Sequence, residues 1–405
     1  MTIVSSPEAP SRGRWTAASV FALSSTLNYL DRLLLASVAP LIIKEFHLSN
    51  EDYGWLLSGL ALAYALASPL AGMLLDRLGF NRGGTLAVGV WSACCAATAA
   101  ARGFGGMIAA RIGLGTAESA GIPAFAKMNA TYLPQREQAV GLAISQVGLS
   151  LGGVLAPALV FWMLPRFTWR APFVVAGLLG FLWIPLWLAV SKAIPPAAQP
   201  APRRAYSATS WTDRRMLVLA VVNILWMGTY VLWSNFTTLF LTHSFHETAR
   251  SAAVYAWFPP VAANLGGFFG GWLSLRWIRA GVDPVTARVR AILVSAVGCL
   301  ITLAVPFAPG SLIATGLIGA SYFAAVAGSV NVYSIPLDLF GPAGAATATS
   351  MLVAAYGLLQ TVLSPLIGRL VDQQGFAPVC VLVSLPPLAG WLVLRWTIGY
   401  TRRLE

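Results

Sequence analysis

The chain has 405 residues, of which 57% are hydrophobic and only 10% are charged, and its mean hydropathy is +0.72. A soluble domain could not keep this composition without very large exposed apolar patches, so the sequence indicates a polytopic membrane protein. The formal net charge is +12, but the basic residues lie in short loops between apolar runs, where lysine and arginine set membrane topology. The charge therefore does not predict nucleic acid as a partner.

Apolar windows of about 20 residues, the length that crosses the hydrocarbon of a bilayer, recur in two sets of six. The first set lies near residues 17–43, 52–76, 83–101, 105–132, 138–165 and 171–191, and the second near 215–242, 250–277, 287–308, 311–337, 343–371 and 376–398. All should be helices, because backbone polar groups in lipid must be satisfied internally. We expect an all-α polytopic membrane protein with twelve transmembrane helices in two pseudo-symmetric six-helix bundles.

These spans predict a division of the chain into five parts. They are a cytoplasmic N-terminal tail (1–16), an N-terminal bundle (17–191), a cytoplasmic linker (192–214), a C-terminal bundle (215–398) and a cytoplasmic tail (399–405). The linker is rich in proline, alanine, arginine and serine and has no apolar period. Arginine concentrates in the N-terminal tail and the even-numbered loops, which places both termini in the cytoplasm.

The two halves also repeat short motifs. Gly72–Arg77 lines up with Gly271–Arg276, and Leu155–Pro157 lines up with Leu363–Pro365, each displaced by about half the chain. A duplicated unit suits a transporter, because a substrate binds at the repeat interface near the midplane while the halves rock around it. A membrane enzyme would not require the duplication.

The sequence GMLLDRLGFNR follows the second span and places charge at a cytoplasmic helix end. A glycine here would allow close helix approach, and Lys127 lies toward the same side of the fourth span. The gating group that we expect there consists of Gly72, Asp76, Arg77, Arg82, Lys127 and Arg136. The alternatives are that the loop only sets topology and that Lys127 only snorkels to the interface.

Two pairs of ionisable residues lie inside spans that are apolar enough to cross a bilayer. They are Asp31 with Arg32 in the first span and Arg111 with Glu118 in the fourth. A charge at the bilayer centre costs about 3 kcal/mol on insertion scales, so such residues indicate a substrate or proton pathway. Arg111 and Glu118 are seven residues apart, about two helical turns, so each must find a partner on another helix. The structural alternative is that Asp31 neutralises Arg111 and fixes two helices together.

The chemistry of these groups suits an anion. Arg32 keeps its charge and presents a planar fork that matches a carboxylate. Asp31 and Glu118 can gain and lose a proton. The three histidines (His47, His243, His246) fall in expected external loops, and the four cysteines (Cys94, Cys95, Cys299, Cys380) have no metal or redox spacing. We expect the cysteines to be small core residues and the carboxylates, with Arg111, to be the proton-coupling groups.

Polar and aromatic side chains in the other spans are secondary candidates for lining a substrate site. They are Asn28, Tyr29, Tyr64, Gln146, Tyr230, Trp233, Asn331, Gln360 and Ser364, with Ser150, Trp226, Asn235 and Tyr333 as further candidates. The alternative for the tyrosines and tryptophans is that they anchor the helices at the membrane interface.

GMLLDRLGFNR resembles the loop between helices two and three of the major facilitator superfamily, except that Asn81 stands where a basic residue is common and Leu275 replaces the aspartate of the second copy. Within that superfamily, NYLDR in the first span, R-x6-E running into SAGIPAFAK in the fourth, GVLAP in the fifth and NVYSIPLDLFGP closing the tenth resemble the anion:cation symporter family. Its members include bacterial hexuronate and galactonate transporters and animal organic-anion transporters. The resemblance covers nearly the whole chain.

This resemblance implies that Arg32 engages a substrate carboxylate, that Glu118 carries the coupled proton, and that Asp31 with Arg111 assists. Ala354 and Leu358 occupy positions where sugar-acid transporters of the family often have asparagine. The departure favours a smaller, less hydroxylated or more aromatic organic acid, or a different pose of the substrate.

We therefore expect a proton-coupled secondary transporter, not an enzyme, that imports a small organic anion across a bacterial inner membrane. Its partners would be the anion and the lipid bilayer, with H⁺ as the coupling ion, no other cofactor or metal, no catalytic residue and a monomeric state. No GxxxxGK[ST] phosphate-binding loop occurs in the sequence, so the energy source would be a gradient.

Three alternatives stay open at this point. The first is a proton-antiporting exporter of metabolites or drugs on the same fold. The second is a lysolipid carrier of the spinster type, which also has an NYLDR-like first helix and a glutamate in the fourth. The third is a membrane-embedded enzyme, against which the lack of a nucleophile elbow and of histidines inside the spans argues.

Overall fold

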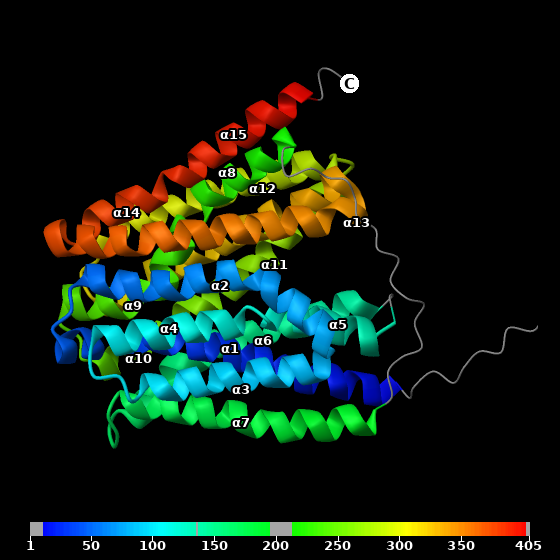
Figure 1. The fold of residues 1–405 in the computed structure, drawn as a ribbon. Helices are drawn as coiled ribbons and strands as arrows, with labels where there is room; N and C mark the ends of the chain where they lie inside the picture. The colour runs from blue at the N-terminus through cyan, green and yellow to red at the C-terminus, as the bar shows by residue number, and fades with distance from the viewer. Residues whose placement is uncertain (1–10, 135–136, 195–212, 402–405) are drawn as a thin grey trace, which may run out of the picture. The chain divides into compact units, whose positions relative to one another are not determined.

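The computed structural model describes residues 11–134, 137–194 and 213–401, and this part of the chain is helical with no strands (Figure 1). The first six predicted spans are α1 (Ser11–Phe46), α2 (Asn50–Leu78), α3 (Phe80–Thr98), α4 with α5 (Phe104–Glu118 and Gly121–Tyr132), α6 (Gln138–Met163) and α7 (Arg170–Ala193). The second six are α8 with α9 (Arg214–Trp226 and Gly228–Phe245), α10 with α11 (Ala249–Ala256 and Phe258–Arg279), α12 with the 3₁₀ helix η2 (Pro284–Cys299 and Leu300–Phe307), the two halves of α13 (Ser311–Gln374), and α14 with α15 (Phe376–Ser384 and Pro386–Thr401).

The predicted all-α fold with twelve spans is confirmed. Within the described residues, nine helical segments are long and apolar enough to cross a membrane by themselves. Prolines explain several interruptions of the other spans. Pro123 has no N–H, so the carbonyl of Ser119 loses its helical donor and α4 ends at Glu118. The boundary between the tenth and eleventh spans lies at Gly341, whose φ of 64° no regular helix contains.

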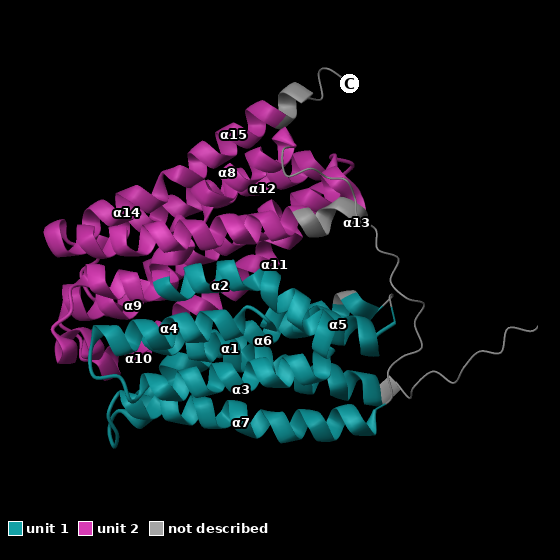
Figure 2. Cartoon of the chain, in the orientation of Figure 1, with its two compact units in different colours: residues 1–35, 59–204 teal, residues 36–58, 205–405 magenta. Residues whose placement is uncertain are grey.

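The described residues group into two compact units (Figure 2). Unit 1 consists of residues 1–35 and 59–204, and unit 2 consists of residues 36–58 and 205–405. Helices α1 and α2 thus change from one unit to the other along their length. The predicted bundles and tails stay predictions, and most of the predicted linker, residues 195–212, lies outside the described residues.

Unit 1 brings α1, α2, α3, α4 and α7 into close contact. Phe21 of α1 packs edge-on against Trp183 and Trp187 of α7, with ring centroids 5.5 and 4.8 Å apart. Gly115 of α4 lies against the backbone of α2, because a Cβ at this position would be 2.3 Å from the carbonyl oxygen of Leu60. A larger residue would push α4 away from α2, so this glycine sets the position of the charged end of α4.

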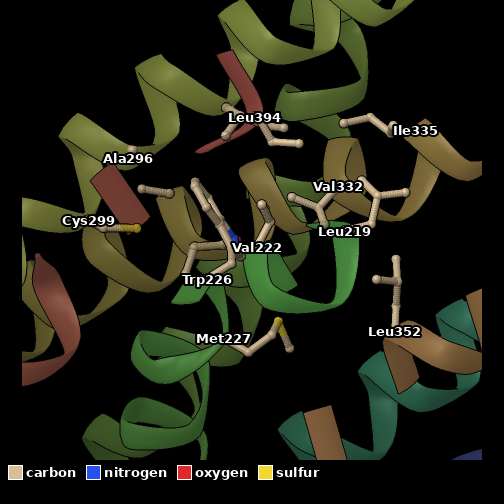
Figure 3. Packing of buried hydrophobic residues seen from close by; sticks show 13 residues of the cluster. Leu219, Val222, Trp226, Met227, Ala296, Cys299, Val332, Ile335, Leu352 and Leu394 are labelled. Carbon is tan, nitrogen blue, oxygen red and sulfur yellow. The ribbon is translucent and has the colours of Figure 1, made fainter. Parts of the chain in front are cut away.

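The core of unit 2 is a cluster of buried apolar side chains (Figure 3). It joins α8, α12, α13 and α15 through residues that include Leu219, Val222, Trp226, Ile292, Ala296, Val332, Leu352 and Leu394. Trp226 is fully buried, and its indole Nε1 donates to the carbonyl oxygen of Ala325 at 2.8 Å. This bond satisfies the one polar atom of a large side chain in the core.

Helix α8 of unit 2 has a capped N-terminus. Asp213 is the N-cap of α8, and its Oδ1 accepts a hydrogen bond from the backbone N–H of Arg215 at 2.8 Å. The side chain of Arg215 also donates to this carboxylate and holds the pKa of Asp213 below its ordinary value.

A second feature of unit 2 is the N-terminus of α2, where the first-turn N–H groups have identifiable acceptors. Asp372 of α13 accepts from the backbone N–H of Asn50 at 3.1 Å and of Glu51 at 3.0 Å. Ser49 Oγ accepts from the N–H of Asp52 at 2.9 Å, and Asp52 Oδ2 accepts from the N–H of Ser49 at 2.9 Å. A helix start normally leaves such groups unpaired, so Asp372 stabilises α2 from another helix.

Further along the same contact, α2 lies directly on the backbone of α13. A Cβ on Gly54 would be 2.4 Å from the carbonyl oxygen of Ser364. Pro365 has no N–H to donate to the carbonyl of Thr361, and Ser58 Oγ donates to that oxygen at 2.6 Å instead. We call this set of contacts the α2/α13 seam.

The seam predicts a contrast between two glycines of α2. Gly54→Ala should lower the free energy of unfolding by about 1–3 kcal/mol, because its new methyl group would force backbone atoms of α13 to move. A Cβ on Gly72 meets nothing within 4 Å. Gly72→Ala should therefore raise the free energy of unfolding by up to about 1 kcal/mol through helix propensity. Thermal unfolding of both purified variants in detergent measures the contrast, and equal unfolding temperatures would contradict the packing described.

Candidate functional site

The first ionisable pair that the structure forms joins α1 to α4 within unit 1. The Arg32 guanidinium donates through Nη2 and Nε to Glu118 Oε2, at 3.0 and 3.2 Å. The Glu118 side chain is fully buried, whereas 19% of the Arg32 side chain remains exposed. A buried acid is therefore neutralised by a cation that keeps contact with the outside of unit 1.

Two predicted lining residues contact this guanidinium. Arg32 Cζ lies 4.9 Å from the ring centroid of Tyr64 in α2 and 5.7 Å from that of Tyr29 in α1. Both distances are within the range of cation–π attraction. Residues of α1, α2 and α4 thus hold the Arg32 side chain in place. The predicted substrate-binding residues Arg32, Tyr29 and Tyr64 lie together with Glu118, which was predicted separately as a proton-coupling residue.

The other two ionisable residues of these spans, Asp31 and Arg111, are wholly buried, and each bonds to α3. Cys95 Sγ donates to Asp31 Oδ1 at 3.3 Å, and Arg111 Nη2 donates to Thr98 Oγ1 at 3.0 Å. Arg111 Cζ also lies 5.7 Å from the ring centroid of Phe173. Asp31 thus takes its hydrogen bond from α3, although Arg111 and Glu118 are both close enough to act on it electrostatically.

These contacts settle two sequence-based expectations. Glu118 and Arg111 each find a partner on another helix, as their spacing predicted. Cys95 is a buried core residue as expected, and its thiol in addition donates a hydrogen bond to Asp31. Thr98 was not predicted. A small polar residue in an apolar run looks the same in sequence whether it packs or binds, so only the three-residue spacing of 95 and 98 hinted at a shared face.

The other predicted lining residues of unit 1 differ in their exposure. Asn28 is buried, and Gly121 at the start of α5 is its neighbour, with its ideal Cβ 3.6 Å from Asn28 Nδ2. Gln146 has an exposed side chain on α6, and its carbonyl oxygen accepts from Ser150 Oγ at 2.9 Å.

In unit 2 the predicted lining residues divide into exposed and packed ones. Tyr230 is partly exposed, and its ring packs edge-on against Tyr322 and Tyr356 at 5.3 and 5.8 Å. Asn331 is fully buried and donates to the carbonyl oxygens of Gly270 and Ala327, at 3.0 and 2.9 Å, so its amide joins α13 to α11. The side chains of Trp233, Gln360 and Ser364 are buried as well.

The expected gating group is partly brought together. Lys127 of α5 forms an ion pair with Asp76 at the end of α2. Arg77 and Arg82 are exposed. Gly72 was expected to allow close helix approach, but in this structure a Cβ there would meet nothing within 4 Å. The remaining member, Arg136, lies outside the described residues.

Two further ion pairs connect helices at ends that the topology predicts to be cytoplasmic. Arg14 of α1 pairs with Glu137 before α6 at 2.7 Å, and Arg288 of α12 pairs with Asp338 of α13. Leu275 stands where the second copy of the gating motif would carry an acid, and Asp338 supplies an acid in the same half. Sequence inspection missed this pair because its acid lies on a different helix from that of the first copy.

Comparisons with known proteins agree with this architecture. Residues 21–350 match the sequence profile of the Major Facilitator Superfamily. The hexuronate transporter of Escherichia coli (strain K12) is 28% identical, with 95% of this chain and 94% of that protein aligned. The D-galactonate transporter of Escherichia coli O6:H1 is 24% identical, with 98% of each chain aligned.

A solved structure shows the same fold. It is that of a bacterial homologue of the human lysosomal transporter Spinster in an inward-facing, occupied conformation, with a TM-score of 0.75, 20% identity and 95% of each chain covered. Both the sequence profile and the relatives are those of transporters rather than enzymes. This chain is a multi-pass membrane transporter and belongs to the Major Facilitator Superfamily.

Proposed function

We propose that this transporter imports an organic anion together with protons, by alternating access, as a monomer in a bacterial inner membrane. The observation that carries the proposal is the pair formed by the partly exposed Arg32 and the buried Glu118. The relatives support the substrate class, because hexuronate and D-galactonate are carboxylate anions.

Coupling follows from the charges of this pair. While Glu118 is ionised, Arg32 neutralises it and the pair has no net charge. A substrate carboxylate that takes over the guanidinium fork leaves Glu118 as an uncompensated buried charge, which is strongly unfavourable. Protonation of Glu118 removes that charge. Anion binding and proton binding therefore favour each other, and the carrier closes at low cost only when both or neither are bound.

The tyrosines next to Arg32 contribute to this exchange. Tyr29 and Tyr64 contact the guanidinium from α1 and α2, so the cation stays in place when its carboxylate partner changes. A preorganised cation loses little side-chain entropy on binding an anion, which favours affinity.

The body of the anion is expected to be less hydroxylated than a sugar acid. In the eleventh span, Ala354 and Leu358 are both exposed on unit 2 and cannot donate or accept a hydrogen bond through their side chains. Tyr356, from the same stretch, packs with Tyr230 and so presents aromatic carbon rather than an amide. Polyhydroxylated substrates need polar partners for their hydroxyls.

Uptake into proteoliposomes tests this proposal. The panel contains labelled hexuronate, galactonate, aliphatic and aromatic monocarboxylates, and a lysolipid, each measured with and without an inward proton gradient. We expect uptake of at least one carboxylate to accelerate when the external side is acidified, with aromatic or small acids preferred over sugar acids. Uptake driven by an outward proton gradient would instead indicate a proton-antiporting exporter, and transfer of the lysolipid alone would indicate a lipid carrier.

A further inference from the structure

The buried cluster behind the Arg32–Glu118 pair contains a thiol that the mechanism above does not use. Asp31, Arg111, Cys95 and Thr98 come from α1, α4 and α3, and none of them is more than 1% exposed. Their burial keeps water away, so the protein alone must supply hydrogen bonds to the charged groups of the cluster.

Cys95 donates a hydrogen bond to Asp31. Its Sγ lies 3.3 Å from Asp31 Oδ1, whereas Asp31 Oδ2 is buried and has no hydrogen-bond partner in the described part of the chain. The ionisable groups that face Asp31 are Glu118 and Arg111 from α4 and Cys95 from α3. Arg111 is held by Thr98, whose own hydroxyl donates to the carbonyl oxygen of Cys94 at 3.0 Å.

The thiol has a second acceptor within reach. Cys95 Sγ also lies 3.6 Å from the carbonyl oxygen of Phe173 in α7. A thiol has one hydrogen, so it can donate to only one of these oxygens at a time. An ionised Asp31 accepts that hydrogen more strongly than a protonated Asp31, so protonation of Asp31 favours donation to the Phe173 carbonyl. Both arrangements need only a rotation about the Cβ–Sγ bond.

We propose that Cys95 is a positioning residue that supports the ionised form of Asp31 and reports its protonation by switching its hydrogen between Asp31 and Phe173. This role rests on the proposed proton-coupled function. The role of Cys95 would make α3 contribute to proton coupling, since this helix binds Asp31 through Cys95 and Arg111 through Thr98.

The first test is the pH dependence of uptake by the full-length protein in proteoliposomes. Cys95→Ala removes the donor to ionised Asp31 and so favours its neutral form. A neutral Asp31 repels an ionised Glu118 less, so the pH of half-maximal uptake should move about 0.5 to 1 unit downward. Cys95→Ser keeps a donor and should stay close to the wild type. The matched control is Cys94→Ala on the same helix, whose thiol makes no described bond to Asp31 and whose midpoint should not move.

The second test observes the thiol directly and does not depend on transport. The infrared S–H stretching band of Cys95, assigned by its loss in Cys95→Ser, should shift between two positions as the pH is changed, and Asp31→Asn should abolish that shift. A band that stays fixed, together with an unchanged uptake midpoint in Cys95→Ala, would overturn the inference while leaving the proposed function intact. A shifting band in a protein whose uptake ignores pH would keep the positioning role and reject proton coupling.

Discussion

Arg32→Ala is expected to lower the initial rate of anion uptake by at least about 100-fold. A truncated partner in a buried, hydrogen-bonded charge pair costs about 2–5 kcal/mol, and here the same side chain would also bind the substrate. Arg32→Lys should restore little, because an ammonium group lacks the planar fork that pairs with a carboxylate through two parallel bonds. Radiolabelled uptake in proteoliposomes measures both variants, and a wild-type rate in Arg32→Lys would contradict the anion clamp.

A loss of stability must be separated from a loss of binding, because Arg32→Ala leaves Glu118 buried and without its cation. Such a charge lowers the free energy of unfolding by about 3–5 kcal/mol. The double variant Arg32→Gln/Glu118→Gln contains no unpaired charge at this place, so it should unfold near the wild-type temperature. It should nevertheless fail to take up the anion, which assigns the loss to the site rather than to folding.

Glu118→Gln is expected to uncouple the transporter. The glutamine keeps the size of the side chain but cannot ionise, so it no longer competes with the substrate for Arg32 and no longer binds a proton. Exchange of labelled for unlabelled anion should therefore continue. Accumulation driven by a proton gradient should fall to the level measured without a gradient, and the acceleration by external acid should disappear.

The matched control for this variant is Glu137→Gln. Glu137 is also paired with an arginine, Arg14, but this pair lies at a helix end, and both side chains are partly exposed. Its removal should leave the acceleration by external acid unchanged. If proteoliposomes with Glu118→Gln accumulated the anion under a proton gradient to the same level as those with Glu137→Gln, another group would have to carry the proton.

The spans of this fold could be predicted because apolar length alone decides which segments cross a bilayer. Some helix ends could also be predicted from the sequence. Pro123 marks the break after Glu118, and the sequence from Ser49 to Asp52 is a capping box that marks the start of α2. The partner of the α2 N-terminus could not be predicted, because Asp372 lies 322 residues from Asn50 and no local pattern relates them.

The charged residues of the candidate site could be predicted because burying them is costly, but their pairing could not. Whether Arg32 meets Glu118 or Arg111 meets Asp31 depends on the rotation of α4 against its neighbours, and the contact of Gly115 with Leu60 fixes α4 against α2. Uncharged polar residues carry a weaker signal. Asn331 was expected to line a site because it is polar, yet its Nδ2 donates to the backbone carbonyls of Ala327 in its own helix and Gly270 in α11.

The change of unit within α1 and α2 has a mechanical consequence. In α1 the change occurs after residue 35, where Pro40 deprives the carbonyl of Ala36 of its donor, and in α2 it occurs after residue 58, next to Gly59. Proline and glycine are where helices flex at least cost. Pro40 and Gly59 therefore mark where α1 and α2 bend most easily, whereas the α2/α13 seam fixes the first turns of α2 against α13.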